Sequence, residues 1–191
     1  MVKFGSILGM ICMIATALLA SVNAVTSGRI RAQAEEELQA SLKEVMPDGT
    51  QFDPVNVNGE TLYFRVTAAD GSLLGAAFKA SAKGYSSVID TIVGMKPDGT
   101  INAIKIVSQQ ETPGLGSRIT EVEATVSIMD FLRGERQQTG LRPWFQTQFD
   151  HKKVSDLDSV EAITGATISS RAVIDSVKQK ARQIQSIITN G

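Results

Sequence analysis

The chain opens on an unbroken apolar run and then changes to patterns typical of amphipathic elements. No charged residue occurs from Phe4 to Val25. As a helix with a rise of about 1.5 Å per residue, this run is long enough to cross a hydrocarbon core of about 30 Å. Apolar residues then recur at helical spacing as far as Pro47-Asp48-Gly49, at Ile30, Ala34, Leu38, Leu42 and Val45. This spacing predicts an amphipathic helix over 26–46.

Short apolar segments separated by turn residues follow. They predict strands at 61–67 and 73–80, joined by the Asp70-Gly71 turn. Two further strands, at 89–96 and 101–107, flank Pro97-Asp98-Gly99-Thr100. Hairpins of this kind pair antiparallel. We therefore expect an α+β fold, with antiparallel β hairpins packed with helices, rather than a doubly wound parallel sheet.

The last third of the chain is expected to be largely helical. One helix is predicted over about 120–133, whereas 141–149, which contains Trp144, has no clear pattern. A stronger helix is predicted over about 169–189. Its apolar positions lie on one face, at Val173, Val177, Ala181, Ile184 and Ile188.

Composition excludes several classes of function. The 191 residues include 19 Lys and Arg against 20 Asp and Glu, a net charge of −1, which argues against nucleic acid as the main partner. The single cysteine, Cys12, lies in the apolar run, so neither an internal disulfide nor a thiolate metal cluster is expected. The single histidine, His151, is interpreted as a solvated loop residue, and no metal site is expected.

The apolar run has two interpretations. As a cleaved signal peptide, it would use Lys3 as its charged region and Val22-Asn23-Ala24 as a loose cleavage pattern. Its length favours an uncleaved membrane anchor. The expected organisation is then an anchor at 1–25, a stalk helix at 26–46 and a domain at 47–191. That domain lies on the extracytoplasmic side of the cytoplasmic membrane if the amino terminus stays inside.

A run of hydroxyl residues, Thr164-Gly165-Ala166-Thr167-Ile168-Ser169-Ser170, stands where the last predicted helix begins. Hydroxyl groups at such a place ordinarily cap free backbone N–H groups. The start of a helix is also a prepared anion site, because its amides are free and its dipole end is positive. Gly165 and Ala166 would let a bulky group approach the backbone. A helix cap and a phosphate site both remain open from these residues alone.

A second loop, Glu111-Thr112-Pro113-Gly114-Leu115-Gly116, has no periodicity. Two glycines and a proline fix an exposed path with bare backbone N–H groups. Glu111 and Thr112 add an acceptor and a hydroxyl, and Leu115 adds an apolar surface. A flat heterocycle with a polar edge needs those elements together. The alternative is an ordinary surface loop.

The two motifs together, behind one amino-terminal apolar segment, resemble the FMN-binding RnfG family of the Rnf electron-transport complex. A related flavin-carrying family of the sodium-translocating NADH:quinone reductase, NqrC, is a sister to it. Gly84-Tyr85, the segment 92–95 and the Asp98-Gly99 turn fit the same layout. Glu161 and Gln109 stand where the RnfG family commonly has Asp and His.

The resemblance implies an FMN joined through its phosphate to Thr167 by a dedicated flavin transferase. The surrounding cofactor-binding residues would be Thr164, Gly165, Ala166 and Ser169 in the first motif, the ETPGLG residues Glu111, Thr112, Pro113, Gly114, Leu115 and Gly116, and Gly84 and Tyr85.

The resemblance also implies the role of the protein. It would be an electron-transfer protein that works with the other membrane subunits of an ion-translocating complex, without catalytic residues and without turning over a substrate alone. One alternative is a free-standing, membrane-anchored flavoprotein reductase of a small acceptor, with Glu111 as its acid or base. Another is a binding module without a cofactor.

Overall fold

The computed structural model describes residues 2–57, 59–122 and 142–190, and the chain divides into two compact units, Met1–Ala40 and Ser41–Gly191. Helix α1 (Val2–Val45) forms the first unit and continues into the second. From Phe4 to Val25 its side chains are exposed, and its most apolar 18-residue window has a mean hydropathy of 2.1. By length and composition, it is the one helix of the described chain that could cross a membrane.

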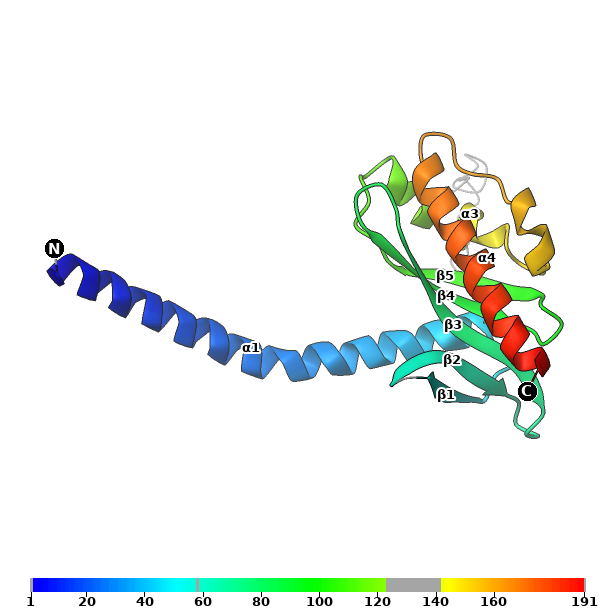
Figure 1. Cartoon of the computed structure of the whole chain (residues 1–191), viewed down its shortest axis with the longest axis horizontal. Coiled ribbons are helices and arrows are strands. Elements are labelled where there is room, and N and C mark those ends of the chain that lie inside the picture. Colours follow the sequence, from blue (N-terminus) through cyan, green and yellow to red (C-terminus); the bar gives the residue numbers. More distant parts are fainter. Residues whose placement is uncertain (1, 58, 123–141, 191) are drawn as a thin grey trace, which may run out of the picture. The chain divides into compact units, whose positions relative to one another are not determined.

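The second unit is built on a five-stranded sheet (Figure 1). Its strands are β1 (Gln51–Val57), β2 (Glu60–Thr67), β3 (Leu73–Lys83), β4 (Val88–Met95) and β5 (Ile101–Ser108). They lie in sequence order, and every neighbouring pair is antiparallel. Gly71 and Gly99 take positive φ angles of 80° and 79° in the turns, which glycine adopts without a steric cost. The expected α+β class and the four predicted strands are confirmed.

Strand β1 is absent from the sequence prediction. It lies at the edge of the sheet and pairs only with β2, with Pro54 opposite Phe64. Proline lacks the N–H that a central strand would use, so it is tolerated at an edge. All seven residues of β1 are exposed or half-buried. The apolar alternation that marks a half-buried strand is therefore weak here.

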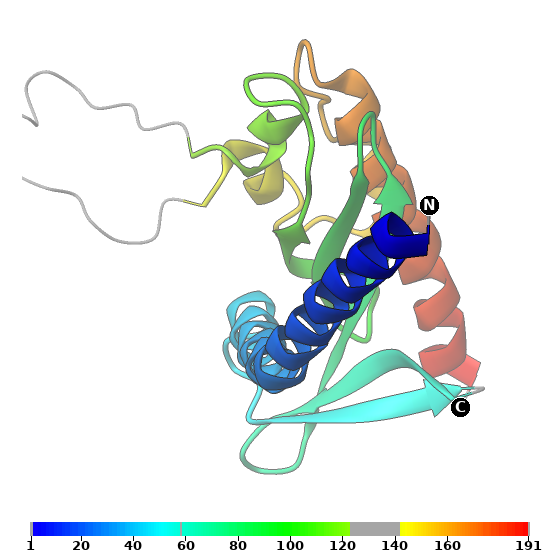
Figure 2. The same ribbon diagram turned by 90° about the vertical axis from the view of Figure 1, so that its left-hand side faces the viewer.

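Helix α4 (Thr167–Asn190) covers one face of the sheet, alongside β3 and β4 (Figure 2). It begins two residues before the predicted start. Four positions of the predicted stripe are buried, and the fifth, Ile188, packs partly buried against the same core: the four are Val173, Val177, Ala181 and Ile184. Across from them lie the inward residues of β3, Ala76, Phe78 and Ala80.

Three short helical turns complete this layer. They are η1 (Gly116–Thr120), α3 (Trp144–Thr147) and η2 (Val154–Ser159). Phe145 and Phe149 are buried here and meet edge to face, with ring centroids 5.5 Å apart. The helix predicted over 120–133 lies outside the described residues from position 123 onward.

The last turn of α1, from Ser41 to Val45, lies on the opposite face of the sheet. Leu42 and Val45 are fully buried. A Cβ added to Gly94 on β4 would stand only 2.5 Å from the carbonyl oxygen of Val45. Gly94 therefore lets the helix backbone rest directly on the strand.

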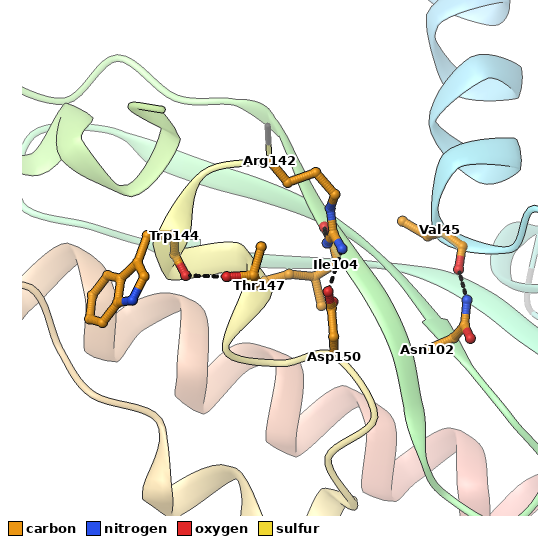
Figure 3. A network of polar contacts seen from close by, with 7 residues as sticks. All are labelled: Val45, Asn102, Ile104, Arg142, Trp144, Thr147 and Asp150. Carbon is orange, nitrogen blue, oxygen red and sulfur yellow. Dashed lines mark hydrogen bonds and ion pairs between the residues drawn. The ribbon is translucent and has the colours of Figure 1, made fainter. Parts of the chain in front are cut away.

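Polar contacts join β5 to the elements on either side of it (Figure 3). The Asn102 side chain donates to the Val45 carbonyl at 2.7 Å, which holds the end of α1. The Arg142 guanidinium donates to the Ile104 carbonyl at 2.8 Å and forms an ion pair with Asp150 at 2.6 Å. These bonds fix the segment that carries α3 along the outer edge of the sheet.

We expect Gly94→Ala to lower the unfolding free energy by about 1–3 kcal/mol, because the added methyl group meets backbone rather than a movable side chain. Thermal unfolding of the full chain in detergent, followed by circular dichroism, measures the loss. An unchanged transition would mean that the last turn of α1 does not press on β4.

Candidate functional site

The two loops singled out in the sequence lie at the same end of the second unit, together with the turn between β3 and β4 (Figures 1 and 2). They enclose an open cavity of about 280 Å³. Its lining residues come from all three segments: Tyr85, Thr112, Leu115, Gly116, Gly165, Ala166, Thr167, Ile168 and Ser169. Segments far apart in the sequence thus form one concave surface.

The carboxylate of Glu111 joins the three segments behind this cavity. The residue is buried, with 6% of its surface exposed. Its Oε1 accepts hydrogen bonds from the Ser86 and Ser87 amides, at 3.0 and 2.8 Å, and from the Ser87 hydroxyl at 3.1 Å. Its Oε2 accepts from the Tyr85 amide at 3.1 Å and from the Ser169 hydroxyl at 2.7 Å. One side chain therefore binds the β3–β4 turn and the first turn of α4.

The same hydrogen bonds determine the ionisation of Glu111. Burial alone would raise the pKa of its carboxyl group. The hydrogen bonds from Ser169, Ser87 and Ser86 outweigh burial and lower the pKa from an ordinary 4.5 to about 2. Glu111 is thus a fixed anion at neutral pH, with its acceptor capacity used by the protein.

Two glycines make room for this carboxylate. A Cβ on Gly84 would lie 2.7 Å from Oε1 of Glu111, and one on Gly116 would lie 2.5 Å from Oε2. The Gly116 position is also 2.8 Å from the Ser169 hydroxyl oxygen. Larger residues at either place would push the carboxylate away from its donors.

The start of α4 separates helix capping from the exposed threonine. The first helical bond runs from the Ser170 amide to the Ala166 carbonyl at 2.9 Å, and the Ser170 hydroxyl accepts from the Ile163 amide at 3.1 Å. Thr167 is the first residue of the helix and is exposed. Its hydroxyl makes no hydrogen bond within the described chain. Capping therefore does not occupy this hydroxyl, while the first amides of the helix have no intrahelical acceptor.

The remaining predicted site residues lie outside the cavity lining. Pro113 and Gly114 are exposed at the tip of their loop. Thr164 lines a neighbouring cavity of about 450 Å³, together with Trp144 and Arg118, whose guanidinium donates to the Thr164 carbonyl at 3.0 Å. The sequence prediction missed Ile168, which lines the site, and the donors that bind Glu111. The run Gly84-Tyr85-Ser86-Ser87 is the signal that could have indicated them.

Comparisons with known proteins agree on one family. A model described as FMN-binding domain matches residues 84–182, and one described as RnfG N-terminal region matches residues 1–45. The G subunit of the ion-translocating oxidoreductase complex of Vibrio atlanticus is 31% identical over 95% of this chain and 89% of its own. The protein of the same name from Methanosarcina acetivorans is 29% identical over 86% and 84%. The crystal structure of Shewanella oneidensis NqrC has 17% identity and a TM-score of 0.43, covering 74% of each chain.

The pKa of Glu111 predicts how stability depends on pH. Because the pKa is lower in the folded protein, the stabilisation is fully present above about pH 4.5 and is lost as pH falls toward 2. The difference corresponds to about 3 kcal/mol. Urea unfolding of wild type between pH 2 and 7 should show this loss, and Glu111→Gln should show a flatter profile. Ser169→Ala, which removes one donor, should lie between them. Identical profiles for wild type and Glu111→Gln would contradict the assignment.

Proposed function

Since the chain belongs to the FMN-binding domain family and to the RnfG family of ion-translocating oxidoreductase complexes, we propose that it is an electron-transfer subunit of such a complex and carries FMN esterified to Thr167. Membership confirms the resemblance drawn from the ETPGLG and TGAT motifs. The flavin is the electron carrier in this proposal, and the remaining subunits of the complex are the partners.

The observation that carries the attachment site is the exposed, unbonded hydroxyl of Thr167 at the edge of the cavity. The residues present fit the cofactor. The amides at the start of α4 suit a phosphate, since they lack intrahelical acceptors and lie at the positive end of the helix. Tyr85 and Leu115, 70% and 52% exposed, offer apolar surfaces for the flavin ring.

The size of the cavity favours a carrier over an enclosed active site. At about 280 Å³ and open to solvent, it lies just below the usual range of about 300–1,000 Å³ for ligand pockets. It would hold part of an FMN and leave an edge accessible to another protein. FMN itself supplies the chemistry, because it accepts either one or two electrons. The chain has only to bind and orient it.

The lining of the cavity also counts against a free-standing reductase. Among the described residues that line it, none has a carboxylate, imidazole, ammonium or guanidinium group that could transfer a proton to a substrate. Glu111, the acid or base that such an enzyme would use, is buried behind the cavity and holds five hydrogen bonds. A relay needs no such group.

The amino-terminal helix supports attachment to a membrane. We place the anchor at 1–25, the stalk at 26–46 and the flavin domain at 47–191 on the extracytoplasmic side of the cytoplasmic membrane. A flavin held there by equilibrium binding alone would be diluted away, whereas an ester bond cannot dissociate. A flavin transferase would form that ester.

We expect the intact mass of the full chain, co-expressed with a flavin transferase, to exceed the polypeptide mass by one FMN less one water. Thr167→Val should abolish the increment. Thr112→Val is the matched control, because it removes a threonine hydroxyl from another wall of the same cavity and should keep the increment. An unmodified wild-type mass under these conditions would refute the covalent attachment.

The relay role predicts stable association with other membrane proteins. Solubilised in mild detergent from cells that express the whole gene cluster, the tagged chain should co-purify with integral membrane proteins. In the complex, the flavin should be reduced by an electron donor that does not reduce the isolated chain. Purification of the chain alone, with turnover of a small acceptor, would instead support the free-standing reductase.

A further inference from the structure

The walls of the cavity come from three segments, and each is bound to the same carboxylate. Tyr85 lines the cavity, and its amide donates to Glu111. Leu115 belongs to the loop that Glu111 begins. Ser169 lines the cavity two residues after Thr167, and its hydroxyl donates to Glu111 at 2.7 Å. The geometry of the cavity therefore depends on one buried anion.

The bond to Ser169 is the buried polar link between the first turn of α4 and the other two walls. Ser169 and Glu111 are 1% and 6% exposed. The second polar link, from Arg118 to the Thr164 carbonyl, is exposed and lies three residues before Thr167. Helix ends fray readily unless their first turn is held. Since Thr167 and Ser169 share that turn, loss of the buried link would release the acceptor hydroxyl from its place beside the ring-binding loop.

We propose that Glu111 is a positioning residue for flavin attachment, because its carboxylate assembles the cavity and holds the turn that carries Thr167. This proposal rests on the proposed attachment at Thr167. It implies that the transferase modifies a folded geometry rather than the linear run Thr164–Thr167 alone. Reaction rates depend steeply on placement, and an error of about 1 Å can cost up to about a hundredfold.

Glu111→Gln tests the carboxylate with little change of shape. The amide replaces one acceptor oxygen by an NH₂ group, which must face N–H or O–H donors that it cannot satisfy. Asp90→Asn is the matched control: its carboxylate, on β4, accepts from the Ser81 hydroxyl at 2.6 Å and pairs with Lys79 at 2.8 Å, but it does not line the cavity. Ser169→Ala removes only the link to α4 and leaves four hydrogen bonds to Glu111.

The measurement is a time course of the FMN mass increment in the full chain after induction of the transferase, well below the unfolding transition of each variant. We expect Glu111→Gln and Ser169→Ala to be modified about tenfold more slowly than wild type, and Asp90→Asn at the wild-type rate. The flavin attached to the slow variants should also fluoresce more like free FMN, because its seat is loosened. A purely structural role would not lower the rate in variants shown to be folded by circular dichroism.

Two outcomes separate this proposal from the attachment itself. If wild type is modified and folded Glu111→Gln and Ser169→Ala are modified equally fast, the positioning role is refuted and the linear motif suffices. If wild type is not modified, the attachment at Thr167 fails instead. Should Glu111→Gln not fold, Ser169→Ala decides, because it keeps the buried carboxylate and its other donors.

Discussion

A buried, ionised carboxylate at one end of the sheet is the contact on which the arrangement of the site depends. Removing a charge from water costs free energy unless hydrogen bonds replace the lost solvation. Within the described chain no lysine or arginine pairs with Glu111. Three backbone amides and two hydroxyls compensate it instead, and the positive end of α4 adds to their effect. Because amides belong to the backbone, the compensation fixes the path of the chain as well as its charge.

The sheet brings those donors to the carboxylate. Strand β3 pairs with β2 only from Leu73 to Ala77, but it pairs with β4 as far as Lys83, opposite Val88. The β3–β4 hairpin therefore extends past β2 and carries the Gly84–Ser87 turn beyond the edge of the sheet. Helix α4 starts at this end and runs back along β3 and β4. Glu111, which follows β5, has both within reach.

Local patterns were sufficient to predict much of the fold, but contacts across the sequence were not. Turns at Asp70-Gly71 and Asp98-Gly99 and the apolar stripe of α4 depend on near neighbours, and all appear in the structure. Strand β1 escaped prediction because Pro54 and its exposed side chains weaken the alternation, although Asn58-Gly59 is a hairpin signal. The cavity joins the two predicted loops, as their chemistry suggested. The role of Glu111 was not predictable, since its donors lie 24 to 58 residues away.

The two faces of the sheet have complementary roles in placing a carrier. On one face lies α4, which begins at Thr167, and on the other lies the last turn of α1, seated on Gly94 and held by Asn102. Both helices pack on the same hydrogen-bonded strands, so the sheet fixes Thr167 relative to Val45. A protein that only carries electrons contributes position, because the redox chemistry belongs to the cofactor. The polar groups that this domain buries serve that purpose: they hold helix ends and loops in place and leave the cavity without an acid or a base.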